Sequence, residues 1–311
     1  MKYMPKGALL ALVLMFGACS PAPQTASSPE GEAAPTSPAQ TARIPYGANI
    51  EASGKFSHDG VTFYYEIYGE GEPLLLVHGN GASIGTMGAQ IEHFKKTRRV
   101  IAMDSRDQGR SGDSTGPYTY ETMADDLAAL LDHLKVGPVD VVGWSDGGIE
   151  ALLLGMRHPE KVRKLVAMAA NLNPTEEAVY PEVVKLAKDA VDSIPADARA
   201  TPRGQRALRV VSLLGAQPQI DPAELKQIEA PTLVISGDQD LIRLEHTVEI
   251  YNHLPNANLA VVPNSTHALP FDDPVLFDAM VERFLNTPFR RKDRILDVNA
   301  SFERYQMEQL R

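Results

Sequence analysis

The chain has a single cysteine, Cys19, so no intramolecular disulfide can form. It also lacks the G-x-x-x-x-G-K loop that cradles phosphates, and no closely spaced cluster of histidine, cysteine and carboxylate side chains indicates a metal site. Basic residues are fewer than acidic ones, 30 against 40, and the formal net charge is −10. This acidity argues against nucleic acid as a partner and against electrostatic binding to anionic lipid. We therefore expect neither a metal nor another cofactor.

The first 18 residues have the pattern of a signal peptide. Two lysines in Met1–Lys6 precede Gly7–Ala18, an uncharged and mostly apolar run that is too short to cross a bilayer. The segment Phe16–Cys19 resembles the lipobox of bacterial lipoproteins, with Phe16 where leucine is usual. The resemblance implies lipidation of Cys19 and a membrane partner in the bacterial cell envelope, periplasmic or outer membrane. The alternative is an ordinary secretory signal that is cut further along, giving a secreted protein.

The remaining chain divides into three parts. Residues 19–49 consist mostly of proline, alanine, serine and threonine, which predicts a disordered tether. Residues 50–286 contain enough apolar residues for one domain with a full core. Residues 287–311 form a tail whose spaced apolar residues fit either a packing helix or a frayed end.

Strand and helix patterns alternate along the domain. This rhythm indicates an α/β fold, a mostly parallel sheet covered by helices on both faces. The expected strands are 61–68, 74–78, 99–104, 139–144, 164–169, 231–236 and 258–262. The rhythm lapses over 171–228, where helical patterns at 183–191 and 205–214 are separated by prolines. An insertion of this size is usually a cap, and the alternative is a helical elaboration away from the site.

The segment Val139–Gly148 combines a strand pattern with the motif G-x-S-x-G around Ser145, and a helical pattern follows it. This context is that of a nucleophile elbow, in which a tight turn exposes the serine hydroxyl above the N-terminus of a helix. Free N–H groups at that helix end can stabilise an oxyanion, so we expect one donor in the backbone N–H of Asp146. The second expected donor is the backbone N–H of Asn80, in the glycine-rich segment His78–Gly81.

A nucleophilic serine needs a base to accept its proton and an acid to orient that base. In a parallel α/β sheet these groups must follow the carboxyl ends of strands. Two late loops qualify, one carrying Asp238 and Asp240 and the other carrying His267. The other histidines are expected to be solvated or packed, and His78, at the end of a strand beside the site, is expected to be structural.

Together these motifs resemble the α/β-hydrolase superfamily over roughly residues 54–285. The chain order serine, acid, histidine is that of the superfamily, whose G-x-x-D pattern implies that Asp240 is the acid and Asp238 the alternative. The segment Asp104–Ser111 resembles the superfamily's D-x-R-G-x-G-x-S turn, with Asp107 where glycine is usual. The resemblance implies an eight-stranded, mostly parallel sheet with helices on both faces and a small helical cap.

The resemblance also implies a serine hydrolase that cleaves a carboxylic ester of a small molecule. Ser145 would attack the carbonyl, His267 would carry the proton, and Asp240 would fix the imidazole, through an acyl-enzyme intermediate. Residues 143–159 look like the valacyclovir-hydrolase group of aminoacyl-ester hydrolases. In that group the acidic residue after the serine binds a substrate ammonium, which implies that Asp146 binds substrate. We also expect Trp144, on the other side of Ser145, to bind substrate.

Several alternatives stay open at this point. A Ser-His-Asp triad also serves hydrolases of amides, lactones, thioesters and C–C bonds, and a binding protein without activity can have the same fold. Asp146 can equally fit the turn and face solvent or the cap. The sequence does not indicate the oligomeric state.

Overall fold

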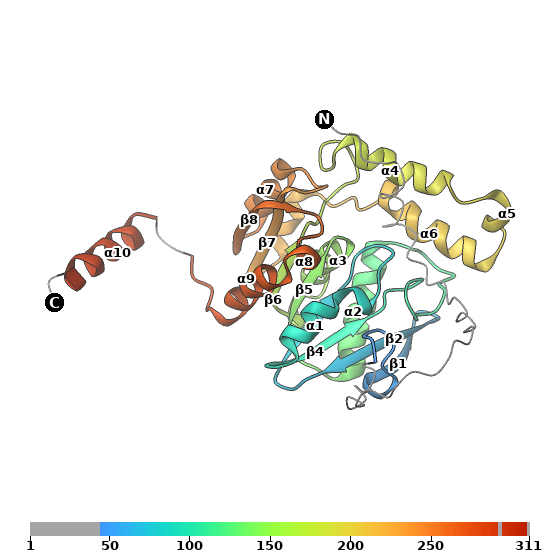
Figure 1. Cartoon of the computed structure of the whole chain (residues 1–311), viewed down its shortest axis with the longest axis horizontal. Coiled ribbons are helices and arrows are strands. Elements are labelled where there is room, and N and C mark those ends of the chain that lie inside the picture. The colour runs from blue at the N-terminus through green and yellow to red at the C-terminus, as the bar shows by residue number, and fades with distance from the viewer. Residues whose placement is uncertain (1–43, 292–293, 310–311) are drawn as a thin grey trace, which may run out of the picture.

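The computed structural model describes residues 44–291 and 294–309. The predicted signal peptide, Cys19 and most of the predicted tether lie outside these residues. Among the described residues, no helix is long and apolar enough to cross a membrane. A central sheet lies between two layers of helices, and a group of further helices covers one end of it (Figure 1).

The sheet has eight strands in the order β1-β2-β4-β3-β5-β6-β7-β8. β2 is antiparallel to both β1 and β4, and all other neighbours are parallel. The strands are β1 (Ser53–His58), β2 (Val61–Tyr68), β3 (Glu72–Val77), β4 (Arg98–Met103), β5 (Val139–Trp144), β6 (Val162–Met168), β7 (Thr232–Gln239) and β8 (Ala257–Thr266). The predicted mostly parallel, eight-stranded sheet is confirmed. The chain runs outward from β3 to β4 and returns to β5, so a crevice for a site is expected where β3 and β5 end.

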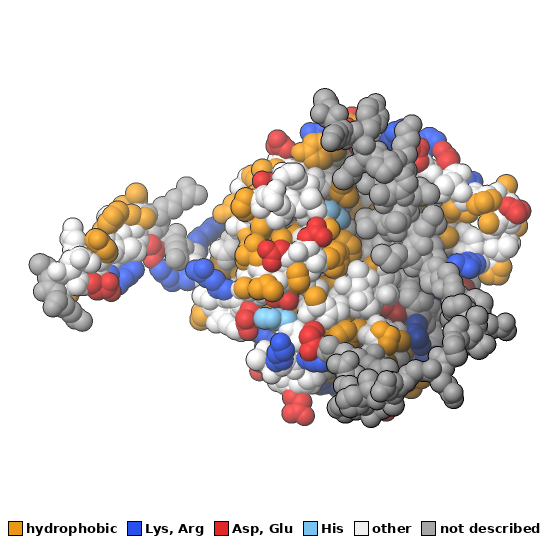
Figure 2. Space-filling model, in the orientation of Figure 1, with side chains coloured by type: hydrophobic (Ala, Val, Ile, Leu, Met, Phe, Trp, Pro, Cys, Tyr) orange, Lys and Arg blue, Asp and Glu red, His pale blue; other side chains and the backbone are white. Residues whose placement is uncertain are grey.

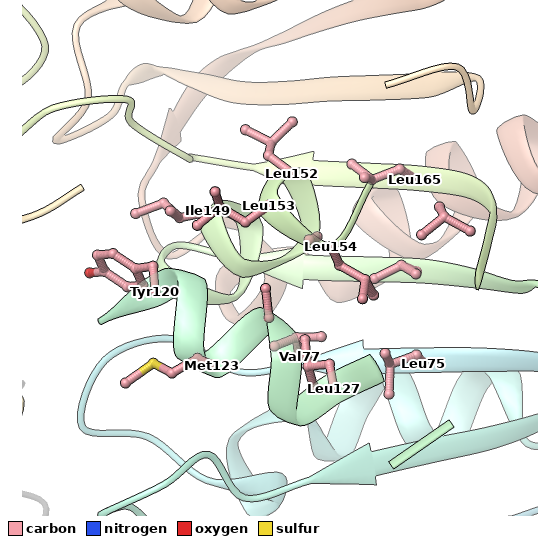
Figure 3. Packing of buried hydrophobic residues seen from close by; sticks show 14 of the residues in the cluster. Leu75, Val77, Tyr120, Met123, Leu127, Ile149, Leu152, Leu153, Leu154 and Leu165 are labelled. Carbon is pink, nitrogen blue, oxygen red and sulfur yellow. The ribbon is translucent and has the colours of Figure 1, made fainter. Parts of the chain in front are cut away.

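Helices cover both faces of the sheet because its central strands are mostly apolar on both faces, and every residue of β5 is buried. One face packs against α2 (Tyr120–Leu134), α3 (Asp146–Arg157) and α7 (Leu244–His253), and the other against α1 (Gly88–Phe94), α8 (Leu269–Asp272) and α9 (Pro274–Asn286). Alternate residues of β3 serve the two faces. Leu75 and Val77 point toward α2 and α3, as Figure 3 shows, whereas Leu74 and Leu76 belong to the opposite cluster.

The bounds of α2 are those that the sequence predicts, because both ends carry local signals. The Thr119 side chain accepts a hydrogen bond from the backbone N–H of Thr122 and so caps the N-terminus. Lys135 ends the helix in the left-handed conformation, with φ 52°. Between these ends an apolar stripe that includes Met123 and Leu127 packs into the core (Figure 3).

The insertion between β6 and β7 contains three α-helices and one 3-10 helix. These are α4 (Pro181–Asp192), α5 (Ala196–Arg199), α6 (Pro202–Ala216) and η5 (Pro222–Gln227). Three of the prolines that interrupt the sequence pattern, Pro181, Pro202 and Pro222, stand at the starts of α4, α6 and η5, where a missing N–H costs no hydrogen bond. Shorter 3-10 turns elsewhere are η2 (Ile50–Ala52), η3 (Ile84–Met87) and η4 (Pro159–Lys161).

Two features at the start of the domain differ from the sequence prediction. Strand β1 was not expected from its residues, because only Phe56 of its six residues is buried and no clear alternation results. The backbone N–H groups of Gly47 and Asn49 donate to the Glu66 carboxylate at 2.7 and 2.8 Å. The packed domain therefore begins a few residues before the predicted boundary at residue 49.

The tail forms a helix, α10 (Arg294–Gln309), which lies apart from the domain in Figure 1. Apolar side chains are exposed on it (Figure 2), among them Val298, Phe302, Tyr305 and Met307. Of the two possibilities for the tail, the structure has a helix, but one that does not pack into the core.

Candidate active site

Ser145 occupies the sharp turn between β5 and α3. Its backbone has φ 57° and ψ −120°, in the positive-φ region that residues other than glycine rarely adopt. A Cβ on Gly143 would lie 1.9 Å from the carbonyl oxygen of Gly147, and a Cβ on Gly147 would lie 2.2 Å from that of Val77. Both glycines of the G-x-S-x-G motif are therefore required by contacts with neighbouring backbone.

Ser145, His267 and Asp240 form one hydrogen-bonded row. The Ser145 hydroxyl oxygen lies 2.9 Å from His267 Nε2, and His267 Nδ1 lies 2.7 Å from Asp240 Oδ1. The Asp240 carboxylate is buried and also accepts a hydrogen bond from the backbone N–H of Ile242 at 3.1 Å. Asp238, the alternative acid, is exposed and accepts from the backbone N–H of Ser265 instead. The structure thus brings together the three residues that the sequence analysis predicted to act together, although they lie on three separate loops.

Trp144 contacts the histidine of this row. Its indole N–H donates to the His267 carbonyl oxygen at 2.8 Å, and its ring packs edge-on against Phe271. The ring is buried. It also leaves no room for a side chain at residue 79 of the neighbouring loop, because a Cβ on Gly79 would lie 2.8 Å from it. The contacts of Trp144 among the described residues indicate that it positions His267. Its predicted contact with substrate stays a prediction.

Asn80 stands between the elbow and the cap. Its side-chain amide donates to Asp146 Oδ2 at 2.8 Å and to the Val210 carbonyl oxygen of α6 at 3.0 Å. The next residue is also held, since the backbone N–H of Gly81 donates to Gln108 Oε1 at 2.7 Å. Gly79, the residue before Asn80, lies against Ser145, since a Cβ on it would be 3.1 Å from the Ser145 Cβ. The loop that carries Asn80 is therefore held next to the elbow, where an oxyanion donor would be needed.

His78, at the start of the same loop, is fully buried. Its Nδ1 lies 2.8 Å from the Gly79 carbonyl oxygen, and its Nε2 accepts from the backbone N–H of Ser105 at 3.1 Å. Burial lowers the pKa of His78, so the ring is neutral at pH 7, with the proton on Nδ1. Its contacts fit the structural role that the sequence predicts.

Two carboxyl groups lie buried one helical turn apart at the start of α3. Burial raises the pKa of Asp146 to about 6, against hydrogen bonds from Asn80 and Tyr120 that favour the charged form. Burial also raises the pKa of Glu150, and the negative charge of Asp146 adds to this effect. Neither oxygen of Glu150 has a hydrogen-bond partner among the described residues.

Glu150 was not identified as a site residue from the sequence. The available signal was its position four residues after Asp146 in a helical pattern, which places the two carboxyls on the same face. The structure shows that this face is buried, so the surroundings of Glu150 favour its neutral form and raise its pKa.

Other chemistry is not apparent in the part of the chain that the structure describes. No group of three or more histidine, cysteine, aspartate and glutamate side chains in residues 44–291 and 294–309 could hold a metal ion. A surface hollow of about 490 Å³ lies between α2, α3 and η5, and its lining includes Arg157 and His158 but none of the hydrogen-bonded row. The site is thus defined by the contacts of Ser145 and its neighbours.

Comparison with known proteins supports the fold and the kind of activity. A family model described as the alpha/beta hydrolase fold matches residues 72–205. A pimeloyl-[acyl-carrier protein] methyl ester esterase from Neisseria meningitidis is 30% identical over 230 residues, which cover 64% of this chain and 87% of the relative. The chain belongs to the α/β-hydrolase family.

This hydrolase is also similar to the human serine hydrolase BPHL, with 28% identity over 258 residues that cover 77% of this chain and 88% of the relative. Among solved structures, an enol-lactonase from Burkholderia xenovorans LB400 superimposes with a TM-score of 0.64 at 21% identity, covering 75% of this chain and all of the other. The named activities differ between an ester esterase and a lactonase. The relatives therefore identify a hydrolase of this fold and leave the bond that it cleaves open.

Proposed function

We propose that this hydrolase cleaves a carboxylic ester of a small molecule through Ser145, His267 and Asp240. The observation that carries the proposal is the unbroken hydrogen-bonded row from the serine hydroxyl to the buried carboxylate. Amide, lactone, thioester and C–C bonds are the alternative targets, because the same three groups serve those reactions. A binding protein without activity is a weaker alternative, since it would have no need of a serine held at positive φ.

In the proposed reaction, the Ser145 hydroxyl oxygen attacks the substrate carbonyl while His267 Nε2 accepts its proton. The negative charge that develops on the carbonyl oxygen is stabilised by the backbone N–H groups of Asn80 and Asp146. The N–H of Asp146 is available because the first N–H groups of a helix have no acceptor within it. His267 returns the proton to the alcohol that leaves, and water then releases the acyl group by the same route in reverse.

Asp240 holds His267 in the tautomer that this reaction needs. With Asp240 accepting the hydrogen bond from Nδ1–H, the lone pair of Nε2 faces Ser145. The hydrogen bond from Trp144 to the His267 carbonyl oxygen fixes the backbone of the same residue. The histidine is therefore oriented through both its ring and its main chain.

Two further parts of the proposal concern substrate and location. Asp146 would favour substrates with an ammonium group near the ester, because a buried carboxylate gains from a neighbouring cation. An α-amino ester should then be hydrolysed with a higher kcat/KM than its deaminated analogue, and equal values would contradict this part. Lipidation at Cys19 would tether the enzyme to the cell envelope, and mass spectrometry of the mature N-terminus tests it. An unmodified terminus beyond Cys19 would rule out the anchor.

The catalytic assignment is tested by labelling with a fluorophosphonate, which reacts with activated serines, followed by a panel of esters of graded acyl length and charge. Ser145→Ala should abolish labelling and lower kcat on the order of 10³-fold or more. Ser57→Ala removes an exposed hydroxyl on β1 and should leave both unchanged. Near wild-type esterase activity in Ser145→Ala would overturn the assignment. Turnover of amides or lactones in preference to esters would replace the proposed substrate class.

A further inference from the structure

The residue that departs from the family's turn, Asp107, makes an unusual set of contacts. Its backbone has φ 60°, the conformation for which glycine is suited, yet its side chain is fully buried. Both carboxylate oxygens are bonded to Arg209 of α6, at 2.9 and 2.8 Å, and both also accept from Ser114, at 2.8 and 2.6 Å. Burial alone would raise the pKa of Asp107, but these partners hold it below its ordinary value. The carboxylate is therefore charged and fully bonded at neutral pH.

A second arginine of α6 also forms hydrogen bonds to the same turn. Arg206 lies one helical turn before Arg209 and donates to the backbone carbonyl oxygens of Asp107, Gly109 and Ser111, the last two at 3.3 and 3.1 Å. It also pairs with Asp113 at 3.2 Å. The arginines lie three residues apart, so both face the turn, and a planar guanidinium can make several such bonds in a fixed geometry.

This attachment determines where the next residue of α6 lies. The Val210 carbonyl oxygen, one residue after Arg209, accepts the Asn80 side chain, which also bonds to Asp146. Gln108, the residue after Asp107, accepts a hydrogen bond from the backbone N–H of Gly81 through its side-chain oxygen. One turn of the chain thus holds both the cap helix and the loop that carries Asn80.

We propose that Asp107 is a positioning residue, which ties α6 to the turn through Arg209 so that the Val210 carbonyl holds Asn80 in place for oxyanion binding. The inference rests on the proposed function, in which the Asn80 backbone N–H is an oxyanion donor. The glycine usual at this position would suit the backbone but would leave Arg209 without its carboxylate. The substitution of glycine by aspartate thereby couples the cap to the catalytic loop.

The chain offers variants that separate this role from simple support of the fold. Asp107→Gly removes the carboxylate but fits the backbone at φ 60°, so the turn is retained. Arg209→Met removes the partner, and Arg209→Lys keeps the charge without the bidentate geometry. Arg203→Met is the matched control, since it removes an exposed arginine near the start of the same helix.

In hydrolysis of p-nitrophenyl acetate by the full chain, Asp107→Gly and Arg209→Met should each lower kcat on the order of 10-fold, with less change in KM. Displacing an oxyanion donor costs less than the roughly 10²–10³-fold of removing one. Arg209→Lys should recover part of the loss, and Arg203→Met should match the wild type. In an Asn80→Ala background, Asp107→Gly should cost little more, because the residue that it positions has lost its side-chain contacts.

Three results would overturn the inference. They are wild-type kcat in Asp107→Gly, an equal loss in Arg203→Met, and a full additional loss in the Asn80→Ala background, which would mean that the cap acts independently of Asn80. Thermal unfolding of each variant shows whether a loss of activity comes from loss of fold instead. If the wild-type enzyme itself is unreactive toward esters and fluorophosphonate, the proposed function fails rather than this inference.

Discussion

Replacing Asp146 with asparagine should change how the stability of the protein depends on pH. Burial raises the pKa of this carboxyl from its ordinary 3.8 to about 6. A rise of about 2 in pKa corresponds to about 3 kcal/mol between the two protonation states. Because the folded state binds the proton more tightly than the unfolded state, the associated stability is fully present below pH 3.8. It is lost as the pH rises to about 6 and above.

Asparagine has nearly the same shape and no charge, so it should not show this loss. Its side chain can still accept from Asn80, and any cost of the exchange itself is independent of pH. The difference in unfolding free energy between Asp146→Asn and the wild type should therefore grow by about 2 kcal/mol from pH 4 to pH 7, in favour of the variant, because a part of the total is already lost at pH 4.

Urea unfolding at four or five values between pH 4 and pH 7 measures this difference directly. Asp197→Asn serves as the matched control, since it removes an exposed carboxyl of α5 and should give a difference that is constant with pH. A constant difference for Asp146→Asn as well would refute the reasoning. It would mean that Asp146 is charged at no cost in the folded protein and is more hydrated than its burial indicates.

Three further predictions follow from the same site. Burial and the charge of Asp146 raise the Glu150 pKa well above 4.5, so the unfolding free energy of the wild type should fall as the pH rises above that value. Glu150→Gln should reduce this fall, and urea unfolding at pH 5 and pH 8 measures it. Gly147→Ala should destabilise the protein by about 2 kcal/mol or more in thermal unfolding, because the new Cβ would meet the Val77 carbonyl oxygen, whereas Gly137→Ala, which has open space around it, should change stability little. Asp240→Asn should lower kcat for esters by about 10³-fold or more by favouring the wrong tautomer of His267, and activity within tenfold of the wild type would exclude Asp240 as the acid.

The fold class follows from local pattern alone. Runs such as Leu74–Val77 and Leu165–Met168 are apolar on both faces, and a parallel sheet between two helical layers buries such strands. The helix α2 is bounded by local features, the capping residue Thr119 at its start and the left-handed Lys135 at its end. Strand β1 carries no such signal, because its pairing with β2 rather than its own side chains makes it a strand.

The row of Ser145, Asp240 and His267 was also within reach of the sequence. Each residue follows a strand pattern, and parallel strands place their carboxyl ends at one edge of the sheet. The choice between Asp238 and Asp240 depended on resemblance, whereas the structure shows one carboxylate buried against His267 and the other exposed.

Other features depended on contacts between residues far apart in the chain. The sequence shows Asp107 only as a departure from a turn motif, and nothing near it indicates Arg209, a hundred residues later on the cap. Likewise, a glutamate in an amphipathic helix is usually solvated, and burial of Glu150 results from the packing of α3 between the sheet and its neighbours. The sequence by itself determined the parallel part of the sheet, the helices that cover it and the chemistry of the nucleophile, because these depend on local spacing. Only the tertiary structure decided which charges are buried and which cap residues reach the catalytic loop, because burial and ion pairing depend on how distant segments pack.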